Sequence, residues 1–293
     1  MSLDERSAGD SAKGALRVDV LVSVGRHGLT ERARRADLDA RALELALGLG
    51  EGGRQLILEA CHAGCDNSET EGALRDYLGM GLNALNWIQT ESSTDVLPLL
   101  RDYLRQHDVS SGPRLVLCGM RAEEGEGSGL VPVALAHELG WASVPGVVAV
   151  ESIKREADHW YAQLLQALPR GQRRRLKVRL PAVLSVDVAA PTPRQSAFGP
   201  ARRGRLERLE PVGELQPDAN LLEWPLMPAR PRPKRLKIVT ASNARDRFKA
   251  AAAKADSGGG KLLKDVTPQQ GAEAILALLR EEGVWRGGSS RSQ

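Results

Sequence analysis

The sequence predicts an α/β fold: a doubly wound parallel sheet between two layers of helices, followed by a C-terminal arm. Two observations predict it. Over the first half of the chain, apolar runs rich in β-branched residues alternate with stretches in which leucine and alanine recur at helical spacing. Glycine-containing and polar segments separate these stretches. Strands that alternate with helices in this way form βαβ units, whose strands are parallel.

The first unit begins with RVDVLVSVGR, residues 17–26, a run typical of a buried strand. Polar residues follow, and a helix is expected from residue 36 until glycines end it near residue 50. Its apolar residues at helical spacing are Leu38, Ala42, Leu45, Ala46 and Leu49.

The same pattern then repeats three times. The expected strands and helices are residues 54–61 and 68–83, 84–91 and 94–109, and 113–119 and 130–140. The helix of residues 68–83 is expected to open at Ser68, because Glu71 stands at capping-box spacing from it.

After Trp141 the pattern changes. Residues 143–179 are expected to form two short strands around an irregular, strongly basic connection. The segment LPAVLSVDV, residues 180–188, is expected to be a further buried strand.

These patterns divide the chain into a flexible N-terminal tail (residues 1–15), an α/β domain (residues 16–224), and a proline-rich linker with a docking arm (residues 225–293). The arm contains two expected helices, near residues 241–255 and after Thr267. Alone the arm has too little apolar surface to fold, so we expect it to dock elsewhere.

Composition limits the class of protein. The chain has 293 residues, 42% of them hydrophobic, and no apolar run near the length of about 18 residues that a membrane span needs. Its first residues lack the apolar core of a secretory signal, so the expected compartment is the cytoplasm. The three cysteines, Cys61, Cys65 and Cys118, make neither a disulfide framework nor a zinc pattern.

The net charge is only +4, but arginines cluster in residues 170–179, 201–208 and 229–235. Such clusters could meet an acidic partner or phosphates, or form a solvated surface. Nucleic-acid binding is disfavoured, because aromatic residues that would stack on bases make up only 3% of the chain.

The segment LCGMRAEEGEGSGL, residues 117–130, combines a strand end with a glycine-rich loop before a helix. Glycine amides and the positive end of a helix dipole make a site for a phosphate, although the loop matches neither G-x-G-x-x-G nor a Walker loop. An ordinary surface loop is the alternative. Glu123, Glu124 and Glu126 suggest a metal, but with no histidine beside them we expect solvated carboxylates that point away from a phosphate. Arg121 is placed to assist a phosphate or to form a surface ion pair.

Four stretches in order resemble the β subunit of the electron transfer flavoproteins, over residues 16 to about 210. They are VLVSVGR, ALRDYLGMGLN, LVLCGMRAEEGEGSG and LPAVLSVDVAAPTPR. The family has a V-A-V-K-R strand, an L-R-x-A-L-A-M-G-A-D helix, a strand followed by G-x-Q-A-I-D-x-D, and an L-P-A-V-V-T-x-D strand that runs to N-x-P-R. The second and fourth matches are specific, whereas the first and third alone are weak.

The resemblance implies an adenine-nucleotide-binding, Rossmann-like domain that pairs with an α subunit holding most of the FAD. The β subunit itself would bury AMP or, in one branch of the family, a second FAD. The heterodimer would accept electrons from a flavin-dependent dehydrogenase and pass them to a membrane quinone reductase. Redox chemistry would belong to the flavin, so no catalytic residue and no metal are expected in this chain.

The resemblance also implies site residues. Those expected around the nucleotide are Ser23, Val24, Cys61, Gly119, Arg121, Gly125, Gly127, Ser128, Gly129 and Leu130. A recognition loop near residues 193–206 would carry Phe198 as the apolar anchor for the donor dehydrogenase. Arg202, Arg203 and Arg205 would surround this anchor, which suits a partner with an acidic rim.

The sequence departs from the family at the nucleotide. Gly25, Arg26 and His27 replace K-R-V, and the hairpin that follows lacks most of its length. Asp39 and Glu44 keep their places in the next helix. Two alternatives stay open: a stand-alone adenine-nucleotide-binding sensor or ligase-type domain, and a nucleic-acid-binding protein that uses the arginine clusters.

Overall fold

The computed structural model describes residues 15–51, 55–106, 112–212, 215–225, 227 and 263–281. The chain divides into two compact units, Met1–Leu226 and Met227–Gln293. Among the described residues, the first unit holds every strand and the second holds helix α8 (Pro268–Glu281). Nearly all of the expected N-terminal tail, most of the proline-rich linker and the helix expected near residues 241–255 lie outside the described residues.

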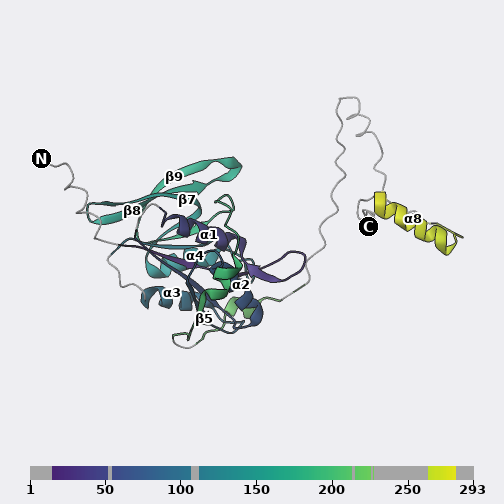
Figure 1. Ribbon diagram of the computed structural model, residues 1–293, viewed down its shortest axis with the longest axis horizontal. Coiled ribbons are helices and arrows are strands. Elements are labelled where there is room, and N and C mark those ends of the chain that lie inside the picture. The colour runs from purple at the N-terminus through teal and green to yellow at the C-terminus, as the bar shows by residue number, and fades with distance from the viewer. Residues whose placement is uncertain are drawn as a thin grey trace, which may run out of the picture. The chain divides into compact units, whose positions relative to one another are not determined.

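A nine-stranded sheet forms the centre of the first unit (Figure 1). Its order is β11–β5–β4–β1–β6–β10–β7–β8–β9. The strands are β1 (Leu16–Leu21), β4 (Leu56–Gly64), β5 (Ala84–Gln89), β6 (Arg114–Gly119), β7 (Ala142–Glu156), β8 (His159–Ala167), β9 (Arg173–Arg179), β10 (Ala182–Val186) and β11 (Arg205–Leu209). Neighbours from β11 to β7 pair in parallel, whereas β8 and β9 pair antiparallel. The expected mostly parallel α/β sheet is therefore confirmed.

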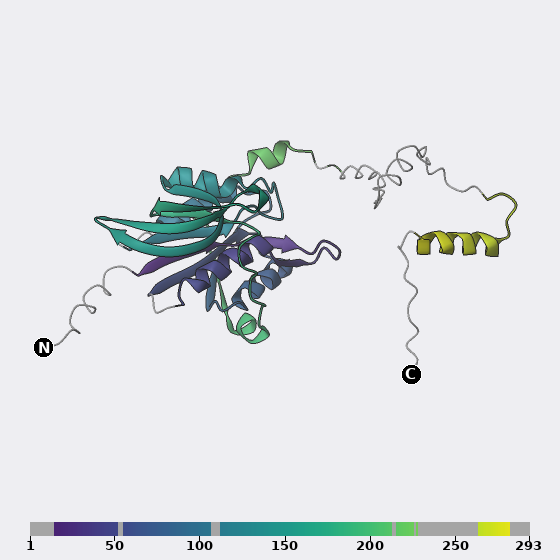
Figure 2. The same cartoon turned by 90° about the horizontal axis from the view of Figure 1, so that it is seen from above.

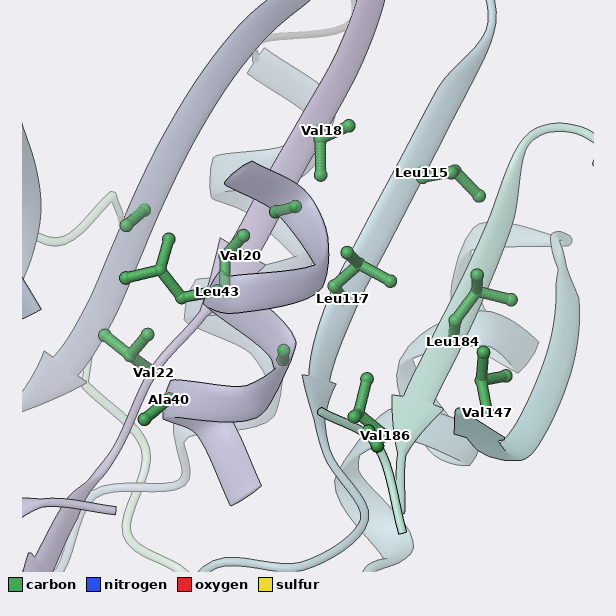
Figure 3. Close-up of a cluster of buried hydrophobic side chains, with 14 of the residues drawn as sticks. Val18, Val20, Val22, Ala40, Leu43, Leu115, Leu117, Val147, Leu184 and Val186 are labelled. Atoms are coloured by element: carbon green, nitrogen blue, oxygen red, sulfur yellow. The ribbon is translucent and has the colours of Figure 1, made fainter. Parts of the chain in front are cut away.

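Helices cover both faces of this sheet, as a doubly wound fold requires. Helices α1 (Asp37–Gly48) and α2 (Ser68–Leu78) pack on the face that carries Val18, Val20 and Leu117. In Figure 3, Ala40 and Leu43 of α1 lie against the valines of the first strand. Helices α3 (Val96–Gln106) and α4 (Leu130–Leu139) cover the other face, over a second buried cluster. None of the helices within the described residues is both long enough and apolar enough to cross a membrane.

The sheet has a topological switch point between β1 and β6. From β1 the chain moves outward on one side through β4 and β5, and it then returns to add β6 on the other side of β1. In open α/β sheets ligands bind at such a point, beyond the carboxyl ends of the strands. The ends of β1 and β6 therefore mark the place to search for a site.

The single strand expected over residues 17–26 is wrong. The first strand ends at Leu21, and the chain turns at Ser23 into an antiparallel hairpin of β2 (Val24–Arg26) and β3 (Ala33–Arg35). In Figure 2 this purple hairpin extends beyond the sheet. The strand stops after Leu21 because Ser23 bonds to Asp39 and Tyr77, which are distant in the sequence. The β-branched run of residues 17–26 gives no sign of these contacts.

The irregular basic connection expected within residues 143–179 is also wrong. This region forms the long antiparallel strands β7, β8 and β9. In β9, Leu176 and Val178 are half-buried and alternate with the exposed side chains of Arg175, Lys177 and Arg179. This two-residue alternation is typical of a strand, but the run of arginines masks it.

Helix ends differ from the expected ones by a few residues. The N-cap of α2 is Asn67, whose side chain accepts a hydrogen bond from the amide of Thr70 at 2.8 Å, so the expected cap at Ser68 is wrong. The helix ends at Leu78 rather than near residue 83. In α8 the expected start after Thr267 is confirmed, because its hydroxyl accepts a hydrogen bond from the amide of Gln270 at 3.3 Å. Two short helices complete the described residues, α5 (Phe198–Arg203) and α6 (Ala219–Glu223).

Candidate functional site

A buried carboxylate, Asp39, lies at the switch point of the sheet. It belongs to the first turn of α1, and its side chain accepts hydrogen bonds from three groups at the ends of β1 and β6. The amide of Ser23 donates at 2.8 Å and its hydroxyl donates to the same oxygen, while the amide of Gly119 donates at 2.6 Å. One carboxylate thus joins the two strands that flank the switch point.

Gly119 allows this close approach. A Cβ atom at this position would lie 2.7 Å from Cβ of Leu38 and 2.7 Å from Oδ1 of Asp39. Because such distances are well inside van der Waals contact, only glycine lets the start of α1 reach the end of β6. The expected close backbone approach at Gly119 is therefore made by this chain's own helix.

Tyr77 of α2 completes the link between β1 and α1. Its buried hydroxyl donates a hydrogen bond to the carbonyl of Ser23 at 2.8 Å and accepts one from the amide of Ala36, also at 2.8 Å. Burial raises the pKa of Tyr77 well above its ordinary value, so the hydroxyl stays protonated and can donate. The Tyr77 side chain thus holds the backbone both at Ser23, just after β1, and at Ala36, just before α1.

The titration of Asp39 gives a pH prediction. Burial raises the pKa of Asp39 from 3.8 to about 6, against the opposing effect of its three hydrogen bonds. Between these two values the folded state holds more protons than the unfolded state, so this group lowers stability as the pH rises from about 4 to about 6. The Asp39→Asn variant lacks this titration. We therefore expect its stability deficit relative to the wild type to shrink over that interval, by up to about 3 kcal/mol. Urea unfolding of both proteins at a series of pH values measures it, and a constant deficit would contradict it.

The loop after β6 contains three glycines in the left-handed region, Gly125, Gly127 and Gly129, with φ of 72°, 63° and 75°. At Gly129 a Cβ atom would lie 2.4 Å from the carbonyl oxygen of Met120. Gly129 is the N-cap of α4 and offers no side chain, while the hydroxyl of Ser128 accepts a hydrogen bond from the amide of Leu130 at 3.2 Å. The loop is mostly exposed, and its backbone conformation depends on glycine.

Two of the three acidic residues of this loop, Glu123 and Glu124, are engaged in ion pairs or hydrogen bonds. Glu123 accepts a hydrogen bond from the amide of Asp37, at the start of α1, at 2.9 Å, and it pairs with Arg34 at 2.8 Å. Glu124 pairs with Arg26 of the hairpin. The expectation that these two carboxylates are merely solvated is therefore wrong. Because cations on the hairpin neutralise them, they repel an anion at the glycines less strongly.

The cysteine expected beside the nucleotide is buried in the core. Cys61 packs in the cluster beneath α3 and α4, and burial raises the pKa of its thiol well above the ordinary value. The next residue, His62, is hydrogen-bonded to the carbonyl of Val22 at 2.8 Å, and burial lowers its pKa to about 4. Val24 lies half-buried in β2, and the side chain of Arg121 is exposed.

The expected recognition residues are exposed and belong to a later segment of the chain than the strands of the switch point. Phe198 begins α5 and is 80% exposed, although it is a large apolar side chain. Arg202, Arg203 and Arg205 follow within one turn of helix and the start of β11, and all three are exposed. Phe198 and the three arginines are thus exposed on one short segment.

Comparison with known proteins decides the family. No family model matches the chain. The chain is 59% identical, over 272 residues, to the electron transfer flavoprotein subunit beta of Chromohalobacter salexigens, and the match covers 93% of this chain and 97% of that protein. This chain belongs to the electron transfer flavoprotein β subunits. The resemblance based on four sequence stretches is therefore confirmed.

In this β subunit, the loop after β6 and the segment around Phe198 stand out in the sequence, whereas the residues that join the strands at the switch point do not. From the sequence, Asp39 is only a position shared with the family, Tyr77 has no expected role, and Glu123 is expected to be a solvated carboxylate. Asp39 is separated from Ser23 by 16 residues and from Gly119 by 80, so no local pattern connects them. Among the described residues, no group of three or more histidine, cysteine, aspartate or glutamate side chains could hold a metal ion.

Proposed function

We propose that this β subunit forms a heterodimer with an electron transfer flavoprotein α subunit, and that the complex carries electrons from a flavin-dependent dehydrogenase to a membrane quinone reductase. The observation that carries the proposal is the match over nearly the full length of a β subunit. FAD, held mainly by the α subunit, would supply the redox chemistry. The role of this chain is then to bind, orient and recognise.

We further propose that the glycine loop holds the phosphate of AMP. Support comes from the left-handed glycines and from the start of α4, where Gly129 offers no side chain and only the amide of Leu130 is engaged by the Ser128 hydroxyl. Backbone amides and the helix dipole favour an anion there. Since the amides of Ser23 and Gly119 already donate to Asp39, we assign these two residues to shaping the crevice. Arg121 would add a positive charge near the phosphate.

The nucleotide can be identified directly. The purified heterodimer is denatured, and the released nucleotides are identified and counted by mass spectrometry. We expect one AMP and one FAD per heterodimer. Two FAD molecules and no AMP would assign a second flavin to this chain, and FAD without a second nucleotide would remove the proposed role of the loop.

The C-terminal arm is proposed to dock on the α subunit. In α8 the apolar side chains of Ile275, Leu278 and Leu279 are exposed and recur at helical spacing, as on a helix that packs against a partner. Cross-linking from α8 in the intact heterodimer would test this, and cross-links confined to the β chain would contradict it.

Phe198 is proposed to be the anchor for the donor dehydrogenase. Replacing it by alanine is expected to raise the apparent KM for the donor by roughly tenfold or more, because a buried aromatic anchor carries much of the energy of an interface. FAD content should not change, since Phe198 contacts solvent rather than the crevice. Steady-state reduction of the heterodimer at varied donor concentration measures the effect.

A matched control is Val212→Ala, which also removes an exposed apolar side chain, 56% exposed at its site. It should leave the KM unchanged. Equal effects of the two variants, or no effect of Phe198→Ala at limiting donor, would contradict the assignment of the anchor.

A further inference from the structure

The recognition segment, residues 196–205, is seated on the C-terminal end of α2. The amide of Ala197 donates to the carbonyl of Gly79 at 2.9 Å, and the amide of Arg205 donates to the carbonyl of Asn83 at 3.0 Å. In Figure 1 the green ribbon of this segment lies beside α2, and α2 and α5 are in contact. Both ends of the segment that carries Phe198 are therefore tied to residues 79–83, the connection between α2 and β5.

Gly79 makes this seat possible through its lack of a side chain. A Cβ atom there would lie 2.0 Å from Oγ of Ser196, 3.0 Å from its Cβ and 3.1 Å from the backbone nitrogen of Ala197. The φ of Gly79 is −61°, an ordinary helical value, so glycine is required here for space and not for backbone conformation. An alanine Cβ there would force the Ser196 hydroxyl to rotate away, and Cβ of Ser196 and the backbone nitrogen of Ala197 would have to move by a few tenths of an ångström.

A second support acts on the other end of α5. Arg75 of α2 donates to the carbonyl of Ala201 at 3.3 Å, and its guanidinium is held by Glu71 at 2.8 Å. Glu71 also accepts a hydrogen bond from Arg208 of β11 at 3.1 Å. One carboxylate thus connects α2 with both α5 and the strand that follows it.

We propose that Gly79 and Arg75 are positioning residues that hold Phe198 in its exposed, binding-competent pose before the donor arrives. An interface formed by a segment that is already ordered does not have to spend free energy on ordering it. Displacing the segment should then weaken association with the donor and leave the electron-transfer step after docking unchanged. The inference rests on the proposed role of Phe198 as anchor.

The test compares Gly79→Ala with Gly72→Ala in the full heterodimer. Gly72 lies in the same helix, and a Cβ atom there would meet nothing within 4 Å. The probe is the purified flavin-dependent dehydrogenase that reduces the wild-type heterodimer fastest in a screen. Gly79→Ala is expected to raise the apparent KM about fivefold at unchanged limiting rate and FAD content, the pattern of lost uniform binding. Gly72→Ala should match the wild type.

Two further variants test the positioning role independently of Gly79→Ala alone. Arg75→Gln removes the guanidinium that reaches Ala201 and should raise the KM about twofold, which covers the case in which Gly79→Ala fails to fold. Adding Phe198→Ala to Gly79→Ala should cause little further loss, because both act on the same contact. If Phe198→Ala raises the KM but neither Gly79→Ala nor Arg75→Gln does, the positioning role is wrong. If Phe198→Ala itself has no effect, the proposed anchor fails instead.

Discussion

Replacing Asp39 by alanine is expected to lower the free energy of unfolding by about 3–5 kcal/mol, the largest effect foreseen for a single side chain outside the apolar core. The substitution removes the acceptor for the amides of Ser23 and Gly119 at the buried ends of two strands. A buried donor without a partner costs about 1–3 kcal/mol, and two such donors would remain. The hydroxyl of Ser23 would lose its acceptor as well. Urea unfolding of the purified protein measures the change.

Asp37→Ala is the matched control, because Asp37 stands in the same first turn of α1. Its carboxylate is about half exposed and forms an i,i+4 ion pair at 2.9 Å with Arg41, whose side chain is largely buried. Such pairs contribute about 0.3–0.5 kcal/mol. If both variants lost similar stability, a general effect of charge at the start of the helix would explain the result, and the role of Asp39 in joining the strands would be wrong.

Replacing Gly129 by alanine is expected to reduce the amount of bound nucleotide by about tenfold or more. A tenfold loss of affinity corresponds to about 1.4 kcal/mol of binding free energy. A side chain at φ of 75° costs about 1–2 kcal/mol in the left-handed region. The added Cβ would also meet the carbonyl oxygen of Met120 at 2.4 Å, and this backbone atom cannot yield without moving the loop. The amides proposed to hold the phosphate would then move apart.

The variant Gly125→Ala separates the cost of the left-handed backbone from the clash with the carbonyl oxygen of Met120. Gly125 has a similar φ of 72°, but a Cβ atom there would meet nothing within 4 Å. Both variants therefore carry the conformational cost, and only Gly129→Ala has the clash. Mass spectrometry of nucleotides released from each purified heterodimer measures the result. Equal losses in both variants would show that backbone conformation alone matters, and full retention in Gly129→Ala would contradict the proposed phosphate loop.

Local periodicity was enough to predict most of the fold. Apart from the break after Leu21 and the hairpin of β2 and β3, the strands and helices up to Gly140 follow from apolar residues at spacings of two or about 3.6 positions, which a single chain displays directly. The strand β9 was missed because arginines fill its exposed positions and leave only Leu176 and Val178 as its apolar side. The expected N-cap of α2 is wrong by one residue because Asn67 and Ser68 are both good N-cap residues. The sequence does not show which of the two has the extended backbone of an N-cap.

The candidate site was predictable only where it is local. Glycines spaced two apart, directly before a helix, indicate an anion site because the amides and the helix start belong to one segment. The crevice is different, since its parts come from separate strands and helices. Asp39 accepts hydrogen bonds from amides that are distant in the sequence. Glu123 pairs with Arg34 of the hairpin and accepts a hydrogen bond from the amide of Asp37 at the start of α1. Such contacts follow from the topology, after the strands have been ordered.

The position of β9 has a consequence for how the molecule behaves in a crowded solution. Among the described strands it is the last of the sheet, so one side of its backbone has no neighbouring strand to pair with. Open edges of this kind invite the strand of another molecule and start aggregation. Arg173, Arg175, Lys177 and Arg179 are exposed along this edge strand, and Arg175 and Lys177 pair with Glu151 and Glu156. Charged side chains along an edge strand disfavour its pairing with a strand of a second copy.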